Sequence, residues 1–228
     1  MDTPVILKTP MKYITKYAAA ALGLSMCAAL SLKASPVTVQ ELGIDPDEYK
    51  VVDITSTNIG GPVSVYAGLI DLSVDGKATE GFCIDPFHWS IAGPQSYQLV
   101  PLSAAPKPPG PMGAATALKI EQLWQKYYSP SMQDADAAGL QIAIWELVDA
   151  AIPGASFTLN SANDYGASTF IAWVNGHPGA AAADLVGLSG AGQDYVVHRV
   201  PDIASTFGLL GFAFVGLVGY RKKILHRS

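Results

Sequence analysis

The sequence predicts an α+β fold, in which an antiparallel β-sheet or barrel-like domain carries a small helical subdomain. Two observations favour this class. Short runs rich in apolar and β-branched residues alternate with turn residues between positions 37 and 91, as in antiparallel sheets. Apolar residues then recur at helical spacing in two runs between positions 113 and 151. We expect this globular domain to span residues 35–199.

The first residues have the pattern of a signal peptide, which we assign to residues 1–34. Three lysines precede an apolar run at residues 17–32, which is short for a membrane span. Small residues follow and predict cleavage after Ala34. Met11 is an alternative start, and Cys27 is expected to leave with the peptide, since Met26 stands where a lipoprotein cleavage box has a small residue.

Composition limits the function classes. The chain has 228 residues, half of them hydrophobic, and a net charge of −5. Without its two ends it has room for one domain of ordinary size. Because it has no basic stretch outside those ends, nucleic acid is not an expected partner.

The first half of the domain is predicted to be β-structure. Strands are expected at residues 49–54 and 63–72, separated by a Gly-Gly-Pro breaker. The Asp-Gly pair at 75–76 predicts a tight turn, after which residues 79–84 return as a third strand. Cys83 is therefore expected on this strand or at its end.

The second half is predicted to be mostly helical. Residues 90–111 are rich in Gly, Pro and Ser and are expected to form a loop or extended connector. Helices are expected from 113 to about 128 and from 135 to 151, with a shorter helix at 168–174. A last strand is expected at 193–197.

Cys83 is the one cysteine outside the N-terminal segment, so the mature protein has no internal disulfide partner for it. An unpaired thiol in an exported protein requires an explanation. A small buried core cysteine is the simplest one. A reactive thiol and an intermolecular disulfide are the others.

The residues around Cys83, together with a downstream helix, resemble a known family. Residues 82–84 (Phe-Cys-Ile), followed by Gln-x-Ala-Ile-Trp at 141–145, are similar to the thioester domain of bacterial surface adhesins. The resemblance covers roughly residues 51–174. It implies that the Cys83 sulfur condenses with the Gln141 side chain, expels ammonia and leaves an internal thioester. The family commonly has Thr before this Gln, whereas this chain has Leu140.

The chemistry explains the residue types. A thiolate is a good nucleophile and an amide a poor electrophile, so the fold has to supply proximity. A thioester also hydrolyses unless water is excluded. Asp85 and His88 are close enough in sequence to assist proton transfer. Apolar pocket residues are expected at Phe82, Ile84, Ala143, Ile144 and Trp145.

The C-terminal segment, residues 200–228, resembles a second known pattern. A Val-Pro-Asp motif leads into an apolar run at 207–220, just long enough for a transmembrane helix when the residues before it are included, and a basic cluster closes it. This arrangement is similar to the PEP-CTERM sorting signals read by exosortases, although Ile203-Ala204 replaces their usual Ser/Gly pair. A plain single-span anchor is the alternative. The sorting residues are Val200, Pro201, Asp202, Arg221, Lys222 and Lys223.

These observations predict an exported surface or extracellular-matrix protein, transiently anchored in the membrane, that attaches covalently to an amine-bearing surface protein or matrix component. Exosortase is the implied processing partner, and the protein is not expected to be a turnover enzyme. A non-covalent matrix protein is one alternative. A cysteine hydrolase with His88 or His177 as base is another, but no Gly-rich elbow frames Cys83. No metal or other cofactor is expected, because the histidines are isolated in sequence.

Overall fold

The structure is a computed structural model that describes residues 36–106 and 109–199. The predicted signal peptide at 1–34 and the predicted sorting segment at 200–228, with its transmembrane helix, lie outside the described residues. Within the described part of the chain, every helix is too short or too polar to cross a bilayer.

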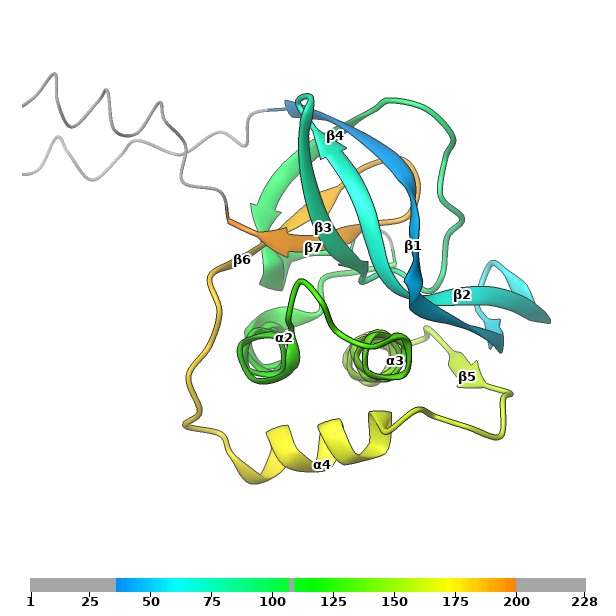
Figure 1. Cartoon of the computed structure of the whole chain (residues 1–228), viewed down its shortest axis with the longest axis vertical. Helices are drawn as coiled ribbons and strands as arrows, with labels where there is room; N and C mark the ends of the chain where they lie inside the picture. The colour runs from blue at the N-terminus through cyan, green and yellow to red at the C-terminus, as the bar shows by residue number, and fades with distance from the viewer. Residues whose placement is uncertain (1–35, 107–108, 200–228) are drawn as a thin grey trace, which may run out of the picture. The chain divides into compact units, whose positions relative to one another are not determined.

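The strands form a closed antiparallel ring in the order β1, β2, β3, β7, β6, β4 and back to β1 (Figure 1). The ring closes because β1 is long enough to pair with β4 near its start and with β2 along most of its length. A short strand, β5, pairs with the last residues of β1. The strands are β1 (Pro36–Ser56), β2 (Gly60–Val74), β3 (Lys77–Cys83), β4 (Gln95–Pro101), β5 (Phe157–Leu159), β6 (Leu185–Ser189) and β7 (Tyr195–His198).

The first three strands confirm the sequence prediction. Val74 pairs with Lys77, so the turn between β2 and β3 contains only Asp75 and Gly76. Both have positive φ, 50° and 78°, as a two-residue hairpin turn of the primed type requires. The Asp-Gly pair therefore sets the register that ends β3 at Cys83.

The prediction of a loop across residues 90–111 is wrong in part, because β4 lies inside it. Only Tyr97 of this strand is buried, so its sequence has no apolar alternation to reveal it. The strand exists because β1 and β6 supply backbone partners on both sides. Strands β5 and β6 are likewise absent from the sequence prediction.

The predicted helices are confirmed, and they pack together as a small helical layer against the ring. They are α2 (Gly113–Tyr127), α3 (Asp134–Ala151) and α4 (Ala167–Gly176), with a 3-10 turn η2 (Leu102–Ala104) before them. Helix α3 contacts β1, β2, β3 and β5 as well as α2 and α4. In Figure 1, α2 and α3 are seen end-on between the strands and α4.

The central position of α3 explains its composition. It is apolar around most of its circumference, as a helix enclosed by other elements has to be. The approach of the segment that leads into α4 is close: a Cβ added at Gly139 would lie 2.2 Å from the Tyr165 carbonyl oxygen. The buried residues of α3 are Ala137, Ala138, Gly139, Leu140, Gln141, Ile142, Ala143, Ile144, Trp145, Leu147 and Val148.

Candidate functional site

Cys83 is the last residue of β3, at a point where this strand is no longer paired with β2. The pairing of β3 with β2 ends at Gly81 and Ile70, two residues before Cys83. On the other edge, the Ile84 N–H donates to the Asp194 carbonyl beside β7, at 3.0 Å. Because successive residues direct their backbone groups to opposite edges, the N–H and C=O of Cys83 point to the edge that β2 has left.

Gln141 of α3 occupies that edge. The backbone N–H of Cys83 donates to Gln141 Oε1 at 2.9 Å, and Gln141 Nε2 donates to the Cys83 carbonyl at 2.7 Å. The carboxamide thus takes the place of a neighbouring strand's peptide group. Both residues are 1 % exposed. The structure therefore brings together the two residues that the resemblance pairs, although they are separated by 58 positions.

The Cys83 sulfur lies in a buried environment that disfavours its charged form. Burial raises the pKa of this thiol well above its usual value, and the carboxylate of Asp85 raises it further. Two N–H groups lower the pKa of this thiol, namely the indole N–H of Trp145 and the backbone N–H of Asp85. The Asp85 N–H donates to Sγ at 3.3 Å.

Asp85 and His88 form a pair beside the thiol. Asp85 is fully buried, and its carboxylate accepts from the Phe87 N–H at 3.1 Å. Its other oxygen lies 2.8 Å from His88 Nδ1. Burial raises the pKa of Asp85, against the opposing effect of His88. Since the His88 side chain is 27 % exposed, the pair links the surroundings of the sulfur to solvent.

The predicted pocket residues are all buried in the core, but they do not all surround the sulfur to the same extent. Phe82 directs its ring to α2, where it meets Trp124 edge-on at 5.4 Å between ring centroids. Trp145 lies one helical turn after Gln141 and packs against Phe157 at 5.6 Å. The buried set comprises Phe82, Ile84, Ala143, Ile144 and Trp145.

Sequence reasoning missed Asp194. This carboxylate is fully buried and accepts from the Gly190 N–H at 2.9 Å, while its negative charge adds to the raised pKa of Cys83. It precedes β7 and reaches the site only because β7 pairs with β3. No local pattern in the sequence marks it.

The other histidines of the described chain are engaged elsewhere. His177 follows α4 as an exposed residue, and its Nδ1 lies 2.7 Å from the Trp173 carbonyl. His198 of β7 accepts from the Trp124 indole. Within residues 36–106 and 109–199, no group of three or more His, Cys, Asp or Glu side chains is arranged to hold a metal ion.

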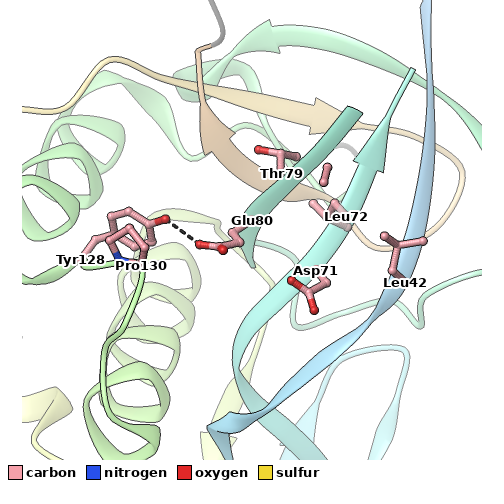
Figure 2. Close-up of a pocket in the computed structure, with 8 residues that line it drawn as sticks. Leu42, Asp71, Leu72, Thr79, Glu80, Tyr128 and Pro130 are labelled. Atoms are coloured by element: carbon pink, nitrogen blue, oxygen red, sulfur yellow. Dashed lines mark hydrogen bonds between the residues drawn. The ribbon is translucent and has the colours of Figure 1, made fainter. Parts of the chain in front are cut away.

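A separate hollow opens on the outside of the sheet, next to the start of the loop between α2 and α3. Figure 2 shows Glu80 of β3 there, accepting from the Tyr128 hydroxyl at 2.7 Å. The hollow, which we call the outer groove, has a volume of about 520 Å³ and includes neither Cys83 nor Gln141. Its lining residues are Leu42, Asp71, Leu72, Ala78, Thr79, Glu80, Tyr128 and Pro130.

Comparison of the chain with known protein families, curated proteins and solved structures finds no match. A functional proposal for this chain therefore rests on its motifs and on the geometry of its site.

Proposed function

We propose that this is an exported surface or extracellular-matrix protein that forms an internal thioester between Cys83 and Gln141 and attaches covalently to amine groups of a partner. The observation that carries the proposal is the paired hydrogen bonding of the Gln141 carboxamide to the N–H and C=O of Cys83 itself. The amide that has to be attacked is held against the residue that carries the nucleophile. Each molecule reacts once, so the protein is not a turnover enzyme.

Formation of the bond uses the donor already present at the carbonyl. The Cys83 N–H donates to Oε1 at 2.9 Å and stabilises the negative charge that develops there when sulfur attacks the side-chain carbon. The carbon–nitrogen bond then breaks, and the thiol proton leaves with nitrogen as ammonia. Asp85, a buried carboxyl whose pKa is raised, suits the transfer of that proton.

Burial gives the product its lifetime. With both residues 1 % exposed, the acyl carbon is sheltered from water. An amine of the partner attacks this carbon, forms an amide on residue 141 and releases the thiol of Cys83. Lysine side chains are the most abundant source of such amines. The partner is accordingly an amine-bearing surface protein or matrix component.

The export part of the proposal rests on the two ends of the sequence. A signal peptide at 1–34 takes the chain out of the cytoplasm. The motif at 200–202, the apolar run and the basic residues 221–223 resemble a tail that exosortase cuts after transient membrane anchoring.

A second candidate function is a non-covalent matrix protein with an inert Cys83. One observation favours it: the hydrogen bonds of Gln141 also complete the backbone bonding at the end of β3. A permanent structural role would require the same geometry. The two functions differ in whether ammonia is lost.

The deciding experiment is the intact mass of gently purified, folded protein. We expect a deficit of one ammonia in the wild type and none in Cys83→Ala or Gln141→Ala, because each removes one condensing group. Methylamine should convert the deficit into an excess of one CH2 group over the sequence mass, because the opened product carries an N-methylamide on residue 141, and it should make Cys83 alkylatable. Gln122→Ala is the matched control, since Gln122 is also a buried helical glutamine that donates to two carbonyls, those of Pro178 and Ala180.

Full sequence mass in the wild type, with Cys83 freely alkylated after unfolding, would replace the covalent proposal by the non-covalent one. Loss of the deficit in the Gln122 control as well would show that the assay reports damage to the fold.

The same mass measurement tests processing. The surface-located form should begin near Ser35 and lack the residues that follow the motif at 200–202. If Lys222 and Lys223 remain attached to that form, the tail is a plain membrane anchor and exosortase processing is wrong.

A further inference from the structure

Trp145 presents a buried polar group that the fold leaves without a partner. Its side chain is 3 % exposed, and its indole Nε1 forms no full hydrogen bond to any described residue. An unpaired buried donor costs free energy, so its retention requires a reason. Trp145 lies four positions after Gln141 in α3, which places both side chains on one face of the helix, the face from which Gln141 bonds to Cys83.

Trp124 shows that the same fold can satisfy a buried indole. It is 2 % exposed, and its Nε1 donates to His198 Nε2 at 2.8 Å. Trp145 differs because no described acceptor meets its N–H in the resting protein. It shares the α3 face that Gln141 presents to Cys83, and its N–H lowers the pKa of the Cys83 thiol, that is, it favours the charged sulfur. That sulfur is a weak acceptor as a thiol and a strong one as a thiolate.

We propose that the indole N–H of Trp145, together with the backbone N–H of Asp85, binds the Cys83 sulfur when it carries negative charge, so that Trp145 is a catalytic residue of the thioester reaction. This inference rests on the proposed function and assigns a new role within the same site. The donor is idle in the resting protein because the charge exists only during reaction.

The role follows from the movement of electrons when an amine opens the bond. The amine nitrogen attacks the acyl carbon, and the carbonyl oxygen gains charge beside the Cys83 N–H. The carbon–sulfur bond then breaks and its electron pair remains on sulfur. The surplus proton of the nitrogen passes to the Asp85–His88 pair and then to sulfur, so the products are an amide and a neutral thiol. The N–H groups of Trp145 and Asp85 donate to the sulfur and so stabilise the negative charge that it carries as it leaves the acyl carbon.

The charged and titratable groups around the sulfur make the donors necessary. Asp85 follows β3, and Asp194 precedes β7; the negative charge of each opposes a thiolate. The pKa values of Tyr97 of β4 and Tyr195 of β7 are raised, mainly by burial, and a negative charge on Cys83 raises both further. Among the described residues that affect this thiol, the N–H groups of Trp145 and Asp85 are the ones that act in favour of the thiolate.

The test compares Trp145→Phe with Trp124→Phe. Both remove a buried indole, but only the first removes the N–H at the sulfur. The first readout is the rate at which methylamine opens the thioester, followed by intact mass. The second is the pKa of Cys83, followed by the ultraviolet absorbance of the thiolate in a Gln141→Ala background, where sulfur stays free.

We expect Trp145→Phe to slow opening roughly tenfold or more and to raise the thiol pKa by about one unit or more, the usual size for a hydrogen bond to a charged group. Trp124→Phe should change neither. If Trp145→Phe does not fold, benzothienylalanine at position 145 keeps the ring shape and removes only the N–H.

Opening at the wild-type rate in a folded Trp145 variant would overturn the inference. Slower opening with an unchanged thiol pKa would also overturn it, because the N–H would then serve the acyl oxygen. If the wild type shows no ammonia deficit, the proposed function fails. The thiol pKa in the Gln141→Ala pair still decides whether Trp145 binds a thiolate.

Discussion

Two regions of β3, at Glu80 and at Cys83, lie three residues apart and differ in burial, in hydrogen-bond partners and in access to solvent. At Cys83, the polar groups are buried, and the oxygen and the nitrogen of the Gln141 side-chain amide both form hydrogen bonds with the backbone of Cys83. At Glu80, the outer groove is open, and a carboxylate meets a tyrosine hydroxyl in a hollow of about 520 Å³. The sequence predicts the thioester at Cys83 and Gln141, and neither residue lines this hollow. A thioester needs the absence of water, and a closed site provides it.

The same difference determines how much free energy of unfolding a substitution removes. Inside the low-dielectric site a misplaced charge or missing donor has no solvent to compensate it. In the groove, water replaces a lost partner. Substitutions in the two regions should therefore differ in size, and the following predictions are ordered by that size.

The largest effect is expected from Gln141→Glu in a Cys83→Ala background, where no thioester forms. A carboxylate oxygen would replace the amide nitrogen that now donates to the Cys83 carbonyl. We expect a loss of about 2–4 kcal/mol at pH 7 relative to Cys83→Ala alone. Urea unfolding measures it.

The pH dependence of this variant has a defined sign. Burial raises the pKa of a carboxyl, so the side chain introduced at position 141 would bind its proton more tightly in the folded state than in the unfolded state. Its destabilising effect should shrink as pH falls from 7 to 5. Glu80→Gln in the groove is the control and should cost well under about 1 kcal/mol. Equal losses for the two variants would contradict the contrast between the regions.

An intermediate effect is expected from Asp85→Asn. The amide keeps an oxygen for the Phe87 N–H but removes the negative charge that raises the pKa of the thiol. The thiol pKa in a Gln141→Ala background should fall by on the order of one unit. Opening by methylamine should nevertheless become slower, because the proton carrier is lost.

Stability sharpens the same test. Burial raises the pKa of Asp85, so its stabilising contribution is present at low pH and is lost as pH rises through the folded-state pKa. Asp85→Asn should therefore lose less stability than the parent between pH 4 and pH 7, as measured by thermal melting. An unchanged thiol pKa would show that the charge of Asp85 does not reach the sulfur.

The smallest effect on the thioester chemistry is expected from Tyr128→Phe in the outer groove. Burial first, and then Glu80, raise the pKa of the Tyr128 hydroxyl well above its usual range, and its hydrogen bond is partly buried. Removing it should cost about 0.5–1.5 kcal/mol in urea unfolding. The methylamine opening rate should stay at the wild-type value. A changed rate would mean that the two regions are coupled through β3.

Local signals in the sequence determined part of this architecture. The Asp-Gly turn at 75–76 and the helical spacing of residues 113–151 are decided by neighbouring residues, and both predictions are confirmed. The pairing of Cys83 with Gln141 was also suggested by sequence, through the similarity of two short motifs to a known family. The ends of the chain, which predict export, remain predictions.

Tertiary structure alone decided the rest. Strand β4 exists because β1 and β6 offer it backbone partners, which no local periodicity records. Asp194 reaches the site through the pairing of β7 with β3, and the Gln141 amide replaces a strand because β2 ends its pairing at Ile70. The idle Trp145 donor is visible only once every neighbour is in place. Periodicity reports which face of an element is apolar, whereas hydrogen-bond satisfaction depends on distant segments that meet only in the folded protein.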